Sequence, residues 1–185
     1  MKVAGKGQGK ILTAAELRLL FSFGLLKPRD RALFGICLFT GCRVSEALAL
    51  QTTDIKNGTL AFRKYTTKGK LKTYVVDIQP GLAQLLALYQ PALPGFLFPG
   101  RQEISHSLTR FMADKILKSA CLRVGLSGVS AHSFKRTALT IMFSTGKPLQ
   151  VIQEISSYND TRDIAVLAES LTRAKEQKCN AVYTI

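Results

Sequence analysis

The sequence predicts an α+β fold that is mainly α-helical, with a small antiparallel β-hairpin set among the helices. Apolar residues recur at helical spacing through most of the chain, whereas residues 59–64 and 73–78 show the two-residue alternation of strands. A length of 185 residues and a hydrophobic content of 46% suit one domain with a substantial core. We therefore expect a single domain over residues 11–185, preceded by a disordered linker over residues 1–10, which are rich in Gly and Lys.

The charge of the chain indicates a polyanionic partner. Lys and Arg total 26 against 12 Asp and Glu, which gives a formal net charge of +14. An excess of this size is typical of proteins that bind nucleic acid. The alternative is a basic surface that serves only solubility.

Two further patterns exclude other classes of protein. Residues 78–100 carry no charged side chain, but prolines interrupt them repeatedly, so we expect no membrane span there. The cysteines show no paired metal-ligand spacing, so we expect free thiols in a reducing cytoplasm and no metal site. These cysteines are Cys37, Cys42, Cys121 and Cys179.

The first part of the chain contains clear helix boundaries. Thr13 and Glu16 have the spacing of a capping box, so a helix is expected to begin there. Pro28 suits the first position of a second helix, and Gly41 suits its end. These signals predict two helices, with a third starting immediately after the glycine.

Later elements follow from turn and helix signals of the same kind. The Asn57-Gly58 pair predicts a turn before the first strand. Pro80 opens a further helix, and another helix is expected to follow Ser105. We expect the apolar face of that helix to bury Phe111 and Met112 in the core.

The tip of the predicted hairpin is strongly basic. Residues 63–72 contain five cations and no acidic side chain. A basic hairpin suits a nucleic-acid groove or a phosphate backbone, so we expect these side chains to contact DNA. The cations are Arg63, Lys64, Lys68, Lys70 and Lys72.

Arg43 occupies an unusual position, near the first turn of the third helix. A cation is electrostatically disfavoured at a helix N-terminus. The side chain is therefore either solvated or directed at an anion. Glu46 lies three residues further on and can hold Arg43 by an ion pair, although a surface pair with no further role is an equally good interpretation.

Residues 131–145 predict a helix, ended by Gly146, that carries a histidine and two cations near its start. His132 and Lys135, or His132 and Arg136, have the i, i+3 and i, i+4 spacings that place side chains on one helix face. Such a cluster is a compact site for a phosphate, so Arg136 is also a candidate DNA contact.

These stretches resemble the motifs of the tyrosine recombinases, the phage integrase family. Residues 40–46 match its Thr-Gly-x-Arg-x-Ser-Glu box, and residues 132–135 correspond to its His-x-x-Arg segment. The resemblance covers roughly residues 12–182. It implies the catalytic domain alone, without the N-terminal domain that usually clasps the other side of the DNA.

The resemblance also implies a reaction and its partners. Members of this family cut one DNA strand without metal or ATP, through a 3′-phosphotyrosyl link that leaves a free 5′-hydroxyl. The expected partners are therefore double-stranded DNA and other recombinase subunits on that DNA. No cofactor, membrane or small-molecule substrate is expected.

Three positions match the family in both type and order. Arg43 corresponds to the first catalytic arginine, and His132 to the histidine that bonds the phosphate. Fixed cations of this kind stabilise the negative charge that develops on the phosphate oxygens. Lys68, or as a second choice Lys70, corresponds to the hairpin lysine that protonates the leaving 5′-oxygen.

Other positions depart from the family. Lys135 replaces the second arginine, which keeps the charge but loses bidentate geometry. Arg136 lies about 100° further round the helix and is no simple substitute. Tyr158 stands where the family usually has His or Trp, and its hydroxyl can still donate one hydrogen bond.

The nucleophile is the most serious departure. Counting from Tyr158 places the expected tyrosine at Leu167, and aligning the tail places it at Ser170. Tyr183 comes too late for the pattern. A serine hydroxyl without an evident base is a poor substitute, so we expect a weak or inactive recombinase domain that still binds DNA. The alternatives are a non-catalytic DNA-binding module and, least favoured, a basic helical protein with an RNA or ribosomal partner.

Overall fold

The computed structural model describes residues 9–63, 73–91, 93–100 and 105–146, together with positions 148 and 152. Contacts divide the chain into two compact units, Met1–Ala138 and Leu139–Ile185. Each unit is described by itself.

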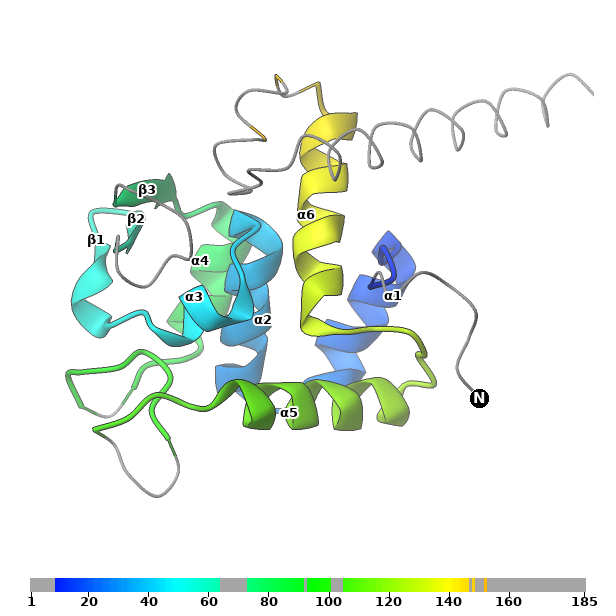
Figure 1. Ribbon diagram of the computed structural model, residues 1–185, viewed down its shortest axis with the longest axis horizontal. Helices are drawn as coiled ribbons and strands as arrows, with labels where there is room; N and C mark the ends of the chain where they lie inside the picture. Colours follow the sequence, from blue (N-terminus) through cyan, green and yellow to red (C-terminus); the bar gives the residue numbers. More distant parts are fainter. Residues whose placement is uncertain are drawn as a thin grey trace, which may run out of the picture. The chain divides into compact units, whose positions relative to one another are not determined.

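Helices dominate the described chain, and one small sheet interrupts them (Figure 1). The elements in order are α1 (Ala14–Leu19), the π-helical turn η1 (Leu20–Gly24), α2 (Pro28–Thr40), α3 (Val44–Leu48), the 3-10 turn η2 (Thr52–Asp54), β1 (Ile55–Lys56), β2 (Thr59–Phe62), β3 (Tyr74–Asp77), α4 (Pro80–Ala87), α5 (Arg110–Arg123) and α6 (Ala131–Ser144).

The predicted boundaries of the first helices are confirmed. The Thr13 hydroxyl accepts the backbone N–H of Glu16, and the Glu16 carboxylate accepts the N–H of Thr13, so the capping box closes. Pro28 is the first residue of α2. Gly41 ends α2 with φ of 68°, a left-handed conformation that glycine adopts without strain.

The sheet is antiparallel, with the strand order β1-β2-β3. Asn57 and Gly58 have φ of 50° and 75° and form the predicted turn between β1 and β2. Phe62 pairs with Tyr74, and the two rings stack at a centroid distance of 4.7 Å. A mainly helical fold with a small antiparallel sheet is therefore confirmed, and β1 is a third strand that the alternation pattern did not predict.

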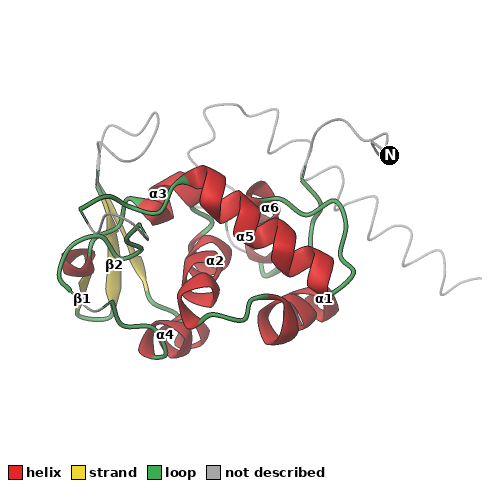
Figure 2. Cartoon of the chain, turned by 90° about the horizontal axis from the view of Figure 1, so that it is seen from below, coloured by secondary structure: helices red, strands yellow, loops and turns green. Residues whose placement is uncertain are grey.

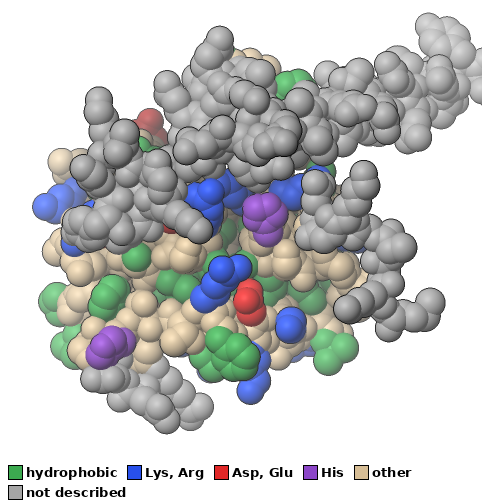
Figure 3. Space-filling model, viewed as in Figure 1, with side chains coloured by type: hydrophobic (Ala, Val, Ile, Leu, Met, Phe, Trp, Pro, Cys, Tyr) green, Lys and Arg blue, Asp and Glu red, His purple; other side chains and the backbone are tan. Residues whose placement is uncertain are grey.

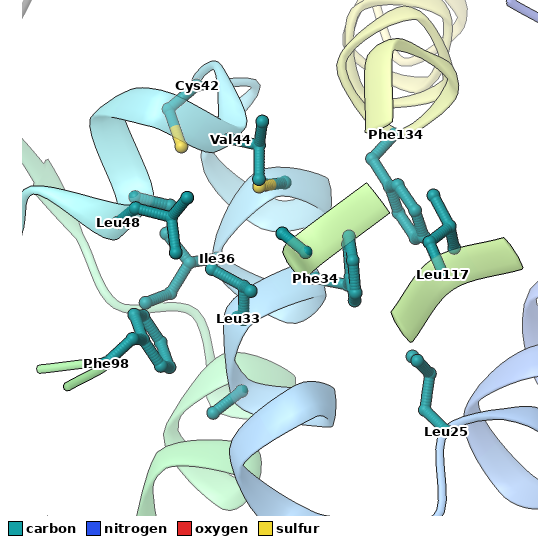
Figure 4. Packing of buried hydrophobic residues seen from close by; sticks show 14 of the residues in the cluster. Leu25, Leu33, Phe34, Ile36, Cys42, Val44, Leu48, Phe98, Leu117 and Phe134 are labelled. Atoms are coloured by element: carbon teal, nitrogen blue, oxygen red, sulfur yellow. The ribbon is translucent and has the colours of Figure 1, made fainter. Parts of the chain in front are cut away.

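Helix α2 is the centre of the core of the first unit. Figures 1 and 2 both show it between the sheet and α1, with α5 lying across it. Phe34 of α2 is fully buried and stacks on Phe134 of α6 at 5.0 Å. Figure 4 shows Phe134 beside Leu117 of α5 as well. The backbone N–H of Leu12 donates to the Thr137 hydroxyl at 2.9 Å, which joins the middle of α6 to the segment before α1.

The expectations for α5 need one correction. The helix follows Ser105 as expected and begins at Arg110, where the Thr109 hydroxyl accepts the backbone N–H of Met112. Phe111 is 75% exposed and Met112 is 39% exposed, so the expectation that both lie in the core is wrong. The buried positions of α5 are instead smaller residues on the adjacent helix face, Ala113, Leu117, Ala120 and Cys121.

The second unit is described for the last turns of α6 and two later positions. Leu139 and Ile152 are buried together, with Met142 and Phe143 packed against them. Gly146 follows α6 with φ of 78°, as expected of a residue that stops a helix. One integrase-like domain over residues 11–185 remains a prediction.

The described helices are also too short or too polar for a bilayer. The longest of them, α5 and α6, have 14 residues each, and no described helix combines the length and the apolar character needed to cross a membrane.

Candidate nucleic-acid interface

The turn between α2 and α3 fixes Arg43 in place. The Thr40 hydroxyl donates to the Ile36 carbonyl at 2.7 Å and accepts the N–H of Cys42 at 3.3 Å. The left-handed Gly41 then reverses the chain, and Arg43 becomes the N-cap of α3. The Thr-Gly pair of the motif therefore sets the point at which the arginine leaves the core.

The side chain of Arg43 is held by Glu46. One Glu46 oxygen accepts the backbone N–H of Arg43 at 2.8 Å, and the other lies 3.3 Å from its Nη1. Glu46 is 2% exposed, whereas the Arg43 side chain is 32% exposed. The predicted i, i+3 pair is thus confirmed, and it holds a guanidinium that is partly open to solvent.

The chemistry of this arrangement suits a phosphate. A guanidinium carries five N–H groups in a rigid fork, and the contact with Glu46 involves a single Nη atom. Phosphate oxygens are bound well by such a fork because two parallel hydrogen bonds form at once. Arg43 can therefore bind an anion from the solvent side while Glu46 holds it from the protein side.

Tyr74 of β3 belongs to the same neighbourhood. Burial, and next the negative charges of Cys42 and Glu46 in their ionised forms, raise the pKa of the Tyr74 hydroxyl, while Arg43 acts in the opposite direction. The Tyr74 hydroxyl is therefore subject to the charges of the Arg43–Glu46 pair. Because Phe62 and Tyr74 are paired, the segment between β2 and β3 leaves the sheet and returns to it at this end.

Arg63, the first cation of that segment, has a partner within the fold. Its Nη2 lies 2.7 Å from Oδ1 of Asp54, its Nε donates to the same oxygen at 2.8 Å, and Nη2 also donates to the Thr53 hydroxyl. Asp54 is 6% exposed. Arg63 therefore joins η2 to β2, and its expected contact with DNA stays a prediction.

The three candidate residues of α6 differ in their surroundings. His132 is exposed, whereas Lys135 is 2% exposed. The Arg136 guanidinium donates through Nη1 to the backbone carbonyl of Gly9. The structure therefore brings His132 to solvent at the first turn of α6, keeps Lys135 inside, and uses Arg136 to hold the N-terminal segment.

A small hollow of about 200 Å³ lies beside His132. Its other wall is α5, which contributes Arg110, Asp114 and Lys118. The motifs and charge patterns of the sequence did not indicate these three residues. Their i, i+4, i+8 spacing on one face of a predicted helix was the available signal.

Arg43 and His132 lie at the starts of two helices that both pack on α2. Contacts join α3 to α2, and the Phe34–Phe134 stack joins the first half of α6 to α2. On the face shown in Figure 3, Lys and Arg side chains and a histidine lie over α3, α5 and the start of α6. This face is the candidate interface.

Several candidates lie outside the described residues: Lys64, Lys68, Lys70, Lys72, Tyr158 and Ser170. Within the described ranges, no group of three or more His, Cys, Asp or Glu side chains is arranged to hold a metal ion. Cys37, Cys42 and Cys121 are buried free thiols.

The chain matches known proteins over most of its length. The phage integrase family model matches residues 10–166. A tyrosine recombinase XerD from Lacticaseibacillus casei is 29% identical over 163 residues, which cover 84% of this chain and 54% of that protein. The chain thus spans about half the length of this relative.

Solved structures share the fold. The XerA recombinase has a TM-score of 0.74 at 16% identity, over 94% of this chain and 65% of that one. The XerH site-specific recombinase, in a pre-cleavage complex with its difH substrate, has a TM-score of 0.68 at 21% identity, over 87% of this chain and 50% of that one. Together with the family match over residues 10–166, this fold shows that the chain belongs to the phage integrase family of tyrosine recombinases.

Proposed function

We propose that the chain acts as the DNA-binding catalytic domain of a site-specific tyrosine recombinase, in DNA integration or recombination. The observation that carries this proposal is Arg43, held by buried Glu46 and open to solvent within the family's own motif. The net charge of +14 supports a polyanionic partner. The partners are then duplex DNA and further recombinase subunits on it, in the cytoplasm.

In this proposal the residues have distinct roles. Arg43 and His132 bind the non-bridging oxygens of one backbone phosphate and stabilise the charge that develops there. Lys68 protonates the leaving 5′-oxygen. Lys135 takes the position of the family's second arginine. Tyr158 takes the position of the family's His or Trp.

A second candidate function is a non-catalytic module that occupies or regulates recombination sites. Leu167 and Ser170 stand where a tyrosine nucleophile is expected. Lys135 provides a charge without the bidentate fork, and it is 2% exposed. Both features favour binding without efficient cleavage, so we propose that cleavage by this chain is weak or absent.

DNA binding tests the role of Arg43 directly. The affinity for a fluorescent duplex is measured by anisotropy at several salt concentrations. Arg43→Ala should weaken binding and reduce the salt slope by about one, as expected for the loss of one phosphate contact. Arg18→Ala is the matched control, because Arg18 is an exposed cation on α1. Equal effects of the two substitutions would remove Arg43 from the interface.

A nicked suicide substrate separates the two candidate functions. The recombinase reading predicts a covalent protein–DNA band in a denaturing gel, faint for the natural sequence and stronger after Ser170→Tyr combined with Lys135→Arg. The non-catalytic reading predicts normal DNA affinity and no band in either protein. A strong band from the natural sequence that Tyr158→Phe or Tyr183→Phe abolishes would overturn the expectation of weak cleavage.

A further inference from the structure

A second, larger hollow of about 670 Å³ lies on the other side of α5. Met112, Ile116 and Arg123 line it, at the i, i+4, i+11 spacing of one helix face. The residues of α5 beside His132, such as Asp114, are about half a turn away round the helix. The larger hollow therefore faces away from the candidate nucleic-acid interface. We call it the α5–α2 hollow.

The inner surface of the α5–α2 hollow is apolar. Leu25 and Leu108 line it and are 1% and 4% exposed, and Ile116 packs partly against the same core. Two apolar side chains lie at the rim: Leu26 is 59% exposed and Met112 is 39% exposed. Apolar side chains that are left open around a concave site are typical of binding surfaces.

Cations surround this apolar surface. Lys27 and Lys115 are exposed lining residues, and neither forms an ion pair with any residue that the structure describes. Arg123 also lines the hollow and donates to the Gly24 carbonyl. The acidic residue in the lining, Asp30, is 6% exposed, and the neighbouring Arg29 neutralises it at 2.8 Å. The hollow thus presents positive charge around an apolar floor.

We propose that the α5–α2 hollow is a docking site for an acidic amphipathic helix of a partner protein. Apolar side chains at i, i+3 or i+4, and i+7 would enter the hollow. Asp or Glu on the flanking positions would meet Lys27, Lys115 and Arg123.

The shape and position of the hollow argue against DNA as its occupant. A DNA backbone offers only the small C–H surface of its sugars to a concave apolar site, and the hollow lies about half a turn round α5 from the residues beside His132. This inference does not depend on the proposed function, since neither DNA binding nor cleavage enters it.

The test uses a synthetic fluorescein-labelled peptide of about four helical turns, with Leu at the three inward positions and Glu on both flanks. Two control peptides replace Leu by Ser, or Glu by Lys. Binding to the full chain is measured by anisotropy. The variant Lys27→Glu/Lys115→Glu is compared with Arg18→Glu/Lys56→Glu, which changes the net charge equally at exposed positions outside the hollow. Circular dichroism and Tm verify that each variant is folded.

The proposal predicts a loss of affinity of at least about tenfold for Lys27→Glu/Lys115→Glu and a much smaller loss for the control pair. Leu26→Ser/Met112→Ser should also weaken binding severalfold, because both side chains are exposed and lie at the rim. Equal losses in the two charge variants, or equal affinity for the Leu and Ser peptides, would overturn the proposal as non-specific attraction. A selective loss of duplex DNA affinity in Lys27→Glu/Lys115→Glu would also overturn it, because the hollow would then be part of a DNA surface.

Discussion

Replacing Glu46 by Gln should destabilise the protein and loosen Arg43. The amide keeps the shape of the side chain and one oxygen to accept the backbone N–H of Arg43, which is bound at 2.8 Å in the natural protein. The attraction between the carboxylate and the Arg43 guanidinium is lost. The change therefore isolates the charge of the pair from its capping role.

The decrease in the free energy of unfolding that we expect for Glu46→Gln lies between the values for exposed and for buried ion pairs. Exposed pairs are worth up to about 1 kcal/mol, and removing one partner of a fully buried pair costs about 3–5 kcal/mol. Glu46 is 2% exposed and the Arg43 side chain is 32% exposed. We therefore expect a loss of about 1–2 kcal/mol, which for a chain of this size lowers Tm by roughly 2–8 °C.

A double-mutant cycle with Arg43→Met is the decisive assay. In that background Glu46 is a buried carboxylate without its cation, so Glu46→Gln should no longer destabilise and should become neutral or stabilising. Urea unfolding of the four proteins gives the coupling free energy. If Glu46→Gln lowers the free energy of unfolding by the same amount in both backgrounds, the pair does not hold Arg43 and this account of the site is wrong.

Three further perturbations test the rest of the structure. The free energy of unfolding should fall above about pH 9, because the hydrogen bond with Cys42, and then burial, raise the pKa of the Cys37 thiol. The folded thiol then keeps a proton that the unfolded thiol releases. Cys37→Ala should flatten the profile of unfolding free energy against pH, and an unchanged slope would contradict this cause. Arg63→Gln should lower the free energy of unfolding by about 2 kcal/mol, because the nearly buried Asp54 loses its ion-pair partner. An unchanged free energy of unfolding, together with a smaller salt dependence of DNA binding, would instead support a DNA contact. Phe134→Ala should lower the free energy of unfolding, measured by calorimetry, by about 4 kcal/mol, because the ring is fully buried. A decrease of less than about 1 kcal/mol would show that Phe134 is not a core residue.

The features that could be predicted from the sequence depend on residues close together in the chain. The capping box of Thr13 and Glu16 and the left-handed Gly41 are formed within a few residues, so their sequence signals are sufficient. The same holds for the Arg43–Glu46 pair, which spans one helical turn. These features were predictable because their residues lie close together in the sequence, and not because of their functional importance.

Features that depend on distant residues could not be predicted in this way. Phe111 and Met112 have the apolar character of core residues, but the burial of one face of α5 depends on the direction from which η1 and α3 pack against it. Local spacing in the sequence does not contain that direction. The contact of Arg63 with Asp54 depends on how η2 packs against β2. The hollow beside His132 likewise needs α5 and α6 to be brought together.

The burial of Lys135 bears on how the fold accommodates a lysine at this position of α6. Lysine is almost never fully buried without a partner, and Lys135, which is 2% exposed, has an interaction partner in the fold. Lysine therefore preserves the cation that the packing of α6 accommodates, and the helix remains in register with the core through Phe134. What lysine cannot preserve is the second hydrogen bond of a guanidinium fork, which contributes most when phosphate charge develops in the transition state. Under the proposed function, stability and DNA binding are thus expected to tolerate lysine at this position, and cleavage is the property expected to decline.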